Sequence, residues 1–375
     1  MPSPCSLGAC ALKPLHVARA SFPGLSFFLQ SARSKPRQFK QAPVPDKSDF
    51  SWSNISIAAL GGVAGAAIFA VVIRGGLGGL FFAHLAPLPL LIIGLGFGLR
   101  HSVTSGLLAT AILSIYPLPV IGMAYGLLVA APAALAIYAA SGAPKAGRDL
   151  ITKDIAGWAS LAPGAVISIV VIAWLVVASL TFGTLEEALN PIRARAFLLI
   201  DAMIKENEIN DKLDPIVLSG IVARAVPALI AGYAVFIHVA NLWFAGRIAQ
   251  GSGLLTQPFP DISQSFRLPQ TVGIVFLAGG AMSFFSGPFA AGGLVLMATM
   301  GFLLACQGLS VIHVKLRHVK YSAFLLTLLY FILGVLGWPI LIFTLIGLAD
   351  LIFHYREGEK GAISPSSDRL PPKLD

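Results

Sequence analysis

Charged residues are scarce in this chain, and their scarcity excludes most classes of soluble protein. Asp, Glu, Lys and Arg make up 11% of the 375 residues, whereas hydrophobic residues make up 56%. A water-soluble domain of this composition would expose large apolar patches. The composition therefore predicts an integral membrane protein whose first partner is the lipid bilayer.

Cysteine is also rare, and the motifs of familiar catalytic sites are missing. Cys5, Cys10 and Cys306 lack metal-ligand spacing and predict neither a disulfide nor a functional thiol. The chain contains no Gly-x-Ser-x-Gly, His-Glu-x-x-His or P-loop motif. We therefore expect no enzyme activity, no cofactor and no metal site.

The formal net charge of +9 comes mainly from the chain ends and from every second connection. This distribution favours lipid headgroups over nucleic acid as partners. Residues 1–54 are expected to form a disordered basic tail, and residues 1–44 contain no Asp or Glu. Such a composition is also typical of an organellar targeting segment. A cytoplasmic tail or a start codon placed too far upstream is preferred, because nothing else in the chain requires an organelle.

Apolar stretches divide residues 55–354 into a transmembrane helical domain, since a spanning helix needs about 20 apolar residues. The predicted spans are Ile55–Ile73, Leu77–Leu99, Ser102–Tyr116, Val120–Tyr138, Leu161–Phe182, Ile216 or Ala225 to Phe244, Val272–Phe285, Phe289–Leu309, Ser322–Leu336 and Pro339–Phe353. The last two could instead be one long helix kinked at Gly337. We therefore predict an all-α, polytopic bundle of about eight to ten spans, followed by a disordered tail at residues 355–375.

The charges of the connections predict the orientation of this bundle. With ten spans, the basic residues fall on the side of the N-terminus, as the positive-inside rule requires of the cytoplasmic side. These residues are Arg100, Lys145, Arg148, Lys153, Arg247, Arg267, Lys315, Arg317, Lys320 and the tail from Arg356. Both termini are therefore expected in the cytoplasm.

A long segment at residues 183–215 interrupts the pattern on the outer side. It carries more acidic than basic residues, and Phe197, Leu198, Ile200, Met203 and Ile204 recur at helical spacing. This spacing predicts an amphipathic helix on the outer surface. It is either a lid over an outward-facing cavity or a connector resting on lipid, and the connector is favoured.

Two Pro-Leu-Pro sequences, at residues 87–89 and 117–119, mark breaks in the apolar stretches. Proline removes a backbone donor and clashes with the preceding turn, so each site predicts a helix start or a sharp kink. Broken helices bind substrate in some transporters. A simple helix start at the membrane surface is the favoured alternative.

Polar side chains within the predicted spans are candidate substrate-binding residues, because they are costly in lipid. His238 lies about 40° from Arg224 around one helix, and Asn241 follows His238 by one turn. His84 precedes the first proline break and completes the candidate set. Alternatively, Arg224 lies among the outer headgroups, because Ala225–Phe244 is long enough to span alone.

The predicted inner loop at residues 259–269 is unusually aromatic and polar. Asp261 and Arg267 are candidate contacts to a cytoplasmic partner, although an N-cap role for Asp261 is the preferred interpretation. Asp350 precedes His354 by four residues, which predicts a local pair on the last helix.

The run Arg100-His101-Ser102-Val103-Thr104-Ser105-Gly106, together with Phe266-Arg267-Leu268-Pro269, resembles a known family. Over Ile55–Glu357 the chain is similar to the YybS-like group of predicted bacterial membrane proteins of unknown function. The resemblance implies the bacterial plasma (inner) membrane, with an organellar inner membrane as the alternative.

That group is distantly similar to the S components of energy-coupling-factor transporters. Those use an Ala-x-x-x-Ala face to contact a coupling subunit, and Ala66 and Ala70 match this spacing. The predicted eight to ten spans depart from the six of an S component, as does the acidic outer segment. No vitamin-binding residues can be carried over.

The leading functional hypothesis is a non-enzymatic membrane protein that binds a small molecule, as part of a transporter without its own motor. It predicts that Arg224, His238 and His84 converge on one water-filled cavity. The alternative is a scaffold or regulator that recruits cytoplasmic subunits through its basic tails and the 259–269 loop. Lipid handling is a third hypothesis, which an apolar groove between helices would favour.

Overall fold

The computed structural model describes residues 52–73, 79, 82–141, 155–206, 213–255, 259 and 261–356. These residues form helices joined by short connections and contain no strand, which confirms the all-α prediction. The predicted N-terminal tail up to residue 51, the connection at 142–154 and the tail from 357 lie outside the described residues.

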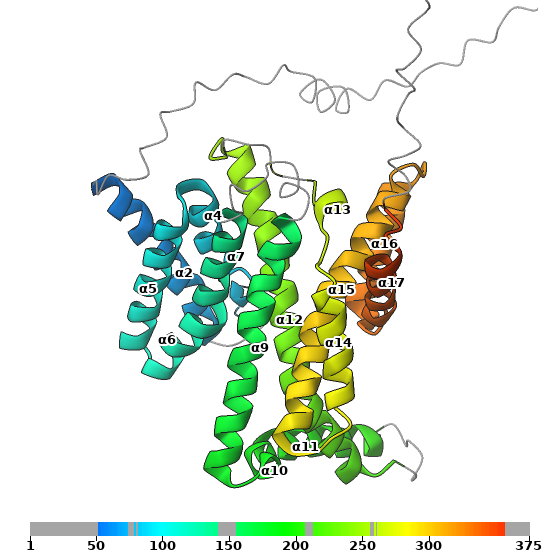
Figure 1. The fold of residues 1–375 in the computed structure, drawn as a ribbon. Helices are drawn as coiled ribbons and strands as arrows, with labels where there is room; N and C mark the ends of the chain where they lie inside the picture. The colour runs from blue at the N-terminus through cyan, green and yellow to red at the C-terminus, as the bar shows by residue number, and fades with distance from the viewer. Residues whose placement is uncertain are drawn as a thin grey trace, which may run out of the picture. The chain divides into compact units, whose positions relative to one another are not determined.

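The first group of helices packs around one hydrophobic core (Figure 1). Its members are α2 (Trp52–Ile73), α4 (Leu88–Phe97), α5 (Leu99–Ile115), α6 (Pro119–Tyr125), the π-helical turn η1 (Gly126–Ala130) and α7 (Ala131–Ser141). Leu90, Leu113, Tyr125 and Ile137 are buried at its centre. The helices α4 and α6 begin at the two Pro-Leu-Pro sequences, as the proline positions predicted.

The second group contains the three longest helices of the described residues, α9 (Ile155–Phe182), α12 (Pro215–Gly251) and α15 (Gly287–Leu316). It also contains α14 (Thr271–Met282), α16 (Ser322–Leu336) and α17 (Ile340–Phe353). Ile167, Val235, Leu303 and Leu304 are fully buried in its core. The helix α12 joins the two groups, because Leu242 near its end packs in the core of the first group.

Within the described residues, fewer helices can cross a membrane than the sequence predicted. Four apolar helical stretches are long enough: Pro119–Ala140, Gly157–Phe182, Pro215–Gly251 and Gly287–Leu316. The predicted span Leu77–Leu99 contains a described helix of only 10 residues, and Val272–Phe285 one of 12. These helices are about 15 and 18 Å long, well short of a hydrocarbon core of about 30 Å. Among the described residues, the candidate spans therefore number four, or five if the bent pair described next is one span, fewer than the eight to ten predicted.

The last two helices form this bent pair. Their axes differ by 120°, and Gly337 at the break has a φ of 68°, a left-handed conformation that suits glycine. With 15 and 14 residues, each helix is about 22 Å long. The pair is either a broken span or a re-entrant loop, and it is not the single kinked helix considered from the sequence.

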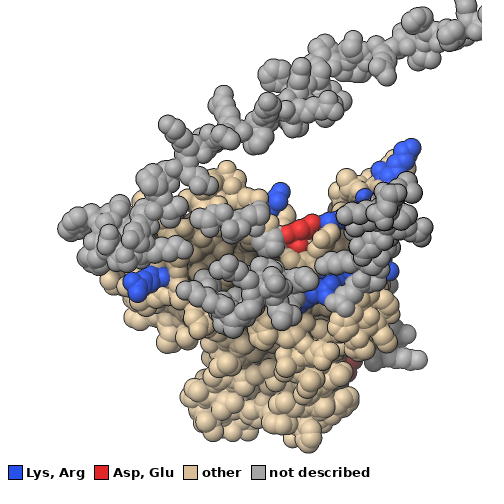
Figure 2. All heavy atoms as spheres, turned by 45° about the horizontal axis from the view of Figure 1, so that its top comes forward, with Lys and Arg blue, Asp and Glu red and all other residues tan. Residues whose placement is uncertain are grey.

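Charged residues separate to the two ends of the bundle. One end, at the top of Figure 1, holds the end of α12, the short helix α13 (Ile262–Ser265) and the end of α15. The charged residues in or beside these segments are Arg247, Asp261, Arg267, Lys315, Arg317 and Lys320, and the contacts described below bring Asp350 and Arg356 to the same end. Figure 2 shows Lys and Arg side chains over this end, which we call the basic end. At the opposite end, α10 (Leu185–Ala188) and α11 (Asn190–Glu206) lie across the ends of the long helices (Figure 1). The helix predicted within residues 183–215 is therefore confirmed.

Candidate functional site

Arg224 does not meet the other residues of the predicted intramembrane site. Its Nη2 lies 2.5 Å from Oε1 of Glu186, and the two side chains are 63% and 66% exposed. Arg247, also exposed, follows 23 residues later on α12, about 34 Å along the axis and close to the thickness of a hydrocarbon core. The exposed pair with Glu186 agrees with the alternative prediction for Arg224, a position near the membrane surface. The buried His238 follows Arg224 by 14 residues, about 21 Å along α12, so the structure does not bring these two side chains together.

His84 and Asn241 do come together. Asn241 Nδ2 donates to the carbonyl oxygens of His84 at 2.6 Å and Ile237 at 2.8 Å. The His84 ring Nε2 lies 2.7 Å from the Tyr233 hydroxyl. His238, three residues before Asn241, is buried, with Nδ1 2.9 Å from the carbonyl oxygen of Ala234. These polar groups lie where α12 meets the first group of helices.

The predicted contact face for a coupling subunit is used inside the chain. Ala66 is only 3% exposed, and Ala70 packs against the same core. A side chain at Gly65 would clash with Tyr125, so α2 approaches its neighbours closely along this stripe. The helices of this chain therefore already cover the face that Ala66 and Ala70 would present.

The 261–269 loop has a local anchor at its start. Asp261 Oδ1 accepts hydrogen bonds from the backbone N–H of Ser263 at 3.2 Å and from its hydroxyl at 2.7 Å, which confirms the predicted N-cap of the short helix α13 (Ile262–Ser265). Arg317, just after α15, forms an ion pair with Asp261. Burial alone would raise the pKa of Asp261, but the bonds from Ser263 and Arg317 and the charge of Arg317 lower it below its ordinary value.

The rest of the loop is held by three polar residues, of which Asp350 and Arg356 lie more than 40 positions after Gln307. Gln307 of α15 accepts a hydrogen bond from the Leu268 N–H at 2.9 Å and donates to Asp350 Oδ2 at 2.8 Å. Arg356 Nη2 lies 2.7 Å from the same carboxylate oxygen, and the Arg356 and Asp350 side chains are 6% and 3% exposed. This buried network fixes the end of α17 against the loop.

Arg356 completes the attachment by bonding the loop backbone directly. Its guanidinium donates to the carbonyl oxygens of Ser263 at 3.2 Å and Phe266 at 2.8 Å. On the other side, a side chain at Gly157 of α9 would overlap the carbonyl oxygen of Arg267. The loop is therefore seated between α9 and the α15–α17 pair, which defines the position of Arg267.

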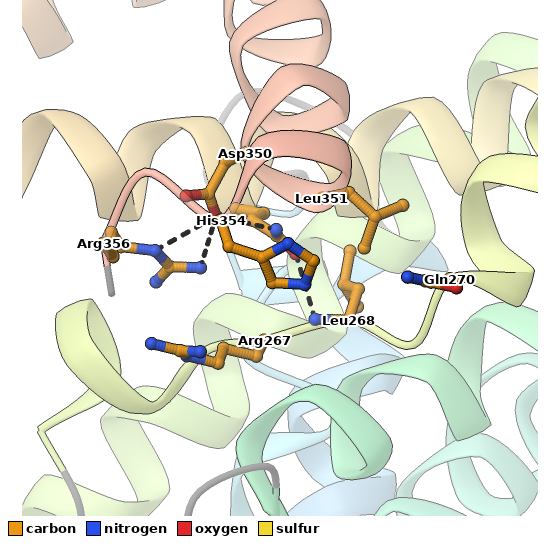
Figure 3. A pocket seen from close by; sticks show the side chains of 8 residues that line it. Arg267, Leu268, Gln270, Asp350, Leu351, His354 and Arg356 are labelled. Carbon is orange, nitrogen blue, oxygen red and sulfur yellow. Dashed lines mark hydrogen bonds and ion pairs between the residues drawn. The ribbon is translucent and has the colours of Figure 1, made fainter. Parts of the chain in front are cut away.

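These contacts enclose a pocket of about 210 Å³ at the basic end (Figure 3). Its wall is formed by Arg267, Leu268, Gln270, Gln307, Asp350, Leu351, His354 and Arg356. Figure 3 shows Asp350 and His354 reaching from α17 toward the loop that carries Arg267. Asp350 Oδ1 is buried and has no hydrogen-bond partner among the described residues. We call this cavity the basic-end pocket.

Sequence reasoning found only part of this pocket. It singled out Arg267 and predicted a local pair between Asp350 and His354, whereas Asp350 pairs with Arg356. His354 has a φ of 52° and ends α17, so its side chain leaves the helical face on which an i,i+4 pair would form. Gln307 was missed, although an amide within a long apolar stretch is a signal that it needs a polar partner.

Residues 63–351 match the family model described as a predicted membrane protein, DUF2232. The chain belongs to this family. This family assignment is consistent with the expected resemblance to YybS-like membrane proteins. The expected resemblance to S components of energy-coupling-factor transporters receives no support from the comparisons. No curated protein and no solved structure matches the chain. The family description gives a location in a membrane and no activity, so function must be argued from the pocket.

Proposed function

We propose that this membrane protein binds a small anionic solute, of the carboxylate or phosphate class, in its basic-end pocket. The composition of the pocket wall carries the proposal. Among the described residues of the wall, Arg267 and Arg356 bring two positive charges against the one negative charge of Asp350, and the side-chain amides of Gln270 and Gln307 add hydrogen-bonding groups. A guanidinium group is the side chain best suited to bidentate binding of a carboxylate or phosphate.

Within this site, the two arginines have different roles. Arg356 is buried and bonds Asp350 and two backbone carbonyls, so it shapes the pocket. Arg267 is only partly buried and comes from the loop, so its guanidinium is the group that would contact the solute. A volume of about 210 Å³ suits a small anion, smaller than the drug-sized ligands of larger pockets.

The proposed role is binding rather than catalysis, and the two arginines and two side-chain amides of the pocket wall support it. We place the protein in the bacterial plasma membrane with its basic end toward the cytoplasm, as the positive-inside rule favours. A solute-binding membrane subunit without its own motor agrees with this arrangement. Recruitment of a cytoplasmic partner through Arg267 stays a prediction.

The test is a thermal-shift titration of the detergent-purified full chain with inorganic phosphate and with citrate. We expect a saturable rise of the unfolding temperature with at least one of them. Arg267→Gln should raise the dissociation constant about tenfold or more, because it removes a charge-assisted hydrogen bond. The matched control is Arg247→Gln, which removes an exposed charge from the same end but not from the pocket.

Two results would contradict the proposal. In one, neither anion stabilises the wild-type chain at concentrations where sodium chloride of equal ionic strength has no effect. In the other, Arg267→Gln and Arg247→Gln weaken binding equally, which would indicate general attraction to the basic end rather than a site.

A further inference from the structure

A second pocket lies at the opposite end of the bundle, between the amphipathic helix α11 and the first turns of α12. Its volume is about 370 Å³. Arg193, Ala194, Phe197 and Leu198 from α11 and Ile216 and Ser219 from α12 line it. Among the described residues of this wall, which also include Asn190, the charged side chain is that of Arg193, and most of the remaining lining is apolar. We call this pocket the α11–α12 groove.

The apolar part of the groove is poorly covered by the chain itself. Leu198 is 67% exposed and Ile216 is 55% exposed, and Val217 and Ile221 continue the exposed apolar surface along α12. Arg224 follows Ser219 by five residues, about 8 Å along the helix, and its exposed pair with Glu186 agrees with a position at the membrane surface. On this placement the groove lies at the level of the lipid headgroups, where exposed leucine and isoleucine side chains are unfavourable unless an apolar chain covers them.

The groove places a positively charged side chain beside an apolar surface, and a phospholipid has a matching charged headgroup and apolar chains. An amphipathic helix at this depth contacts both headgroups and the upper acyl chains. Arg193 can pair with a phosphate, while Phe197, Leu198 and Ile216 offer an apolar surface directly beside it. Since the chain is a membrane protein, phospholipid is the amphiphile present at this level in excess.

We propose that the α11–α12 groove binds one anionic phospholipid, with its phosphate on Arg193 and an acyl chain along Phe197, Leu198 and Ile216. This site is independent of the proposed anion site, because the two lie at opposite ends of the bundle and share no residue. The bound lipid would cover the exposed apolar side chains and fix α11 against α12.

The experiment is native mass spectrometry of the full chain in a non-ionic detergent, titrated with phosphatidylglycerol and separately with phosphatidylcholine. Two matched pairs of variants separate the headgroup from the acyl chain. Arg193→Gln removes the charge in the groove, and Arg195→Gln removes an exposed charge from the same helix outside it. Ala194→Trp fills the groove, whereas Ala202→Trp adds the same ring at an exposed position outside it.

We expect one phosphatidylglycerol to stay bound to the wild type and to both control variants. Arg193→Gln should reduce its affinity about tenfold, which is roughly 1.4 kcal/mol. Ala194→Trp should abolish retention, and inorganic phosphate should not compete. The proposal would be overturned if all four variants retained phosphatidylglycerol equally. It would also be overturned if the chain retained detergent but no lipid, or if inorganic phosphate displaced the lipid.

Discussion

Removing one partner of the buried pair between Asp350 and Arg356 is expected to destabilise the protein strongly. The two side chains are 3% and 6% exposed, and Asp350 Oδ2 accepts bonds from Arg356 and Gln307. Asp350→Asn keeps the shape of the side chain but leaves the buried guanidinium of Arg356 without a counter-charge. For such buried pairs, loss of one partner costs about 3–5 kcal/mol. Arg356→Gln should cost a similar amount, because it leaves the buried Asp350 carboxylate without a counter-charge.

The double variant Asp350→Leu/Arg356→Met separates the cost of a stranded charge from the value of the pair. Replacing both partners by apolar groups leaves no charge to desolvate, so its cost should be well below the sum of the two single changes. The control is Glu186→Gln, which breaks the exposed pair with Arg224 and should cost no more than about 1 kcal/mol.

The assay is equilibrium unfolding in detergent micelles, followed by helical circular dichroism across a denaturant series. The free energies of unfolding of the wild type, both single variants, the double variant and the control give the coupling energy directly. The reasoning is refuted if Asp350→Asn costs no more than Glu186→Gln. It is also refuted if the double variant costs the full sum of the single changes.

Two further predictions concern the same end of the bundle. Gly347→Ala should lower the free energy of unfolding by about 3 kcal/mol or more, because its Cβ would overlap the Leu304 carbonyl of α15. Gly334→Ala on α16, where nothing lies nearby, should be neutral or slightly stabilising; equal losses would contradict this contact. Because the pKa of Asp261 is lowered from its ordinary 3.8, the stability that this carboxylate contributes is present above pH 3.8 and is lost as the pH falls through the lowered value. Stability curves between pH 6 and 2 should therefore be flatter for Asp261→Asn than for the wild type, and identical slopes would contradict the Arg317 pairing.

The helical fold could be predicted because composition and local chemistry determine it. Leu161–Phe182 and Phe289–Leu309 are long apolar runs, and both lie within single helices of the structure. The span count could not be predicted in this way. An apolar run shows that a segment can be buried in lipid or in a protein core. It does not show where the chain changes direction, as it does at Gly337 within the run 322–353.

Local features of the candidate site were also within reach of the sequence. The N-cap at Asp261 depends on residues two positions away, and the place of Arg224 follows from the length of the apolar segment after it. The network of Gln307, Asp350 and Arg356 was out of reach, because its partners are up to 49 residues apart and meet only when α15, α17 and the loop pack together. Periodicity along one helix cannot report such a contact.

Glycine residues link the packing of the helices to the polar network of the candidate site. Gly308 and Gly347 let the backbones of α15 and α17 touch, since a side chain at either would overlap a carbonyl group of the other helix. Gln307 is the neighbour of Gly308, and Asp350 lies one turn after Gly347, so this close crossing allows a bond of 2.8 Å between two side chains on separate apolar helices. Glycines in membrane helices are too common to indicate a site alone. The informative pattern has two parts: one apolar helix carries a glycine next to its amide side chain, and a second carries a glycine one turn before its carboxylate. Together they indicate that the two helices cross closely there, so that the amide and the carboxylate can form a hydrogen bond with each other.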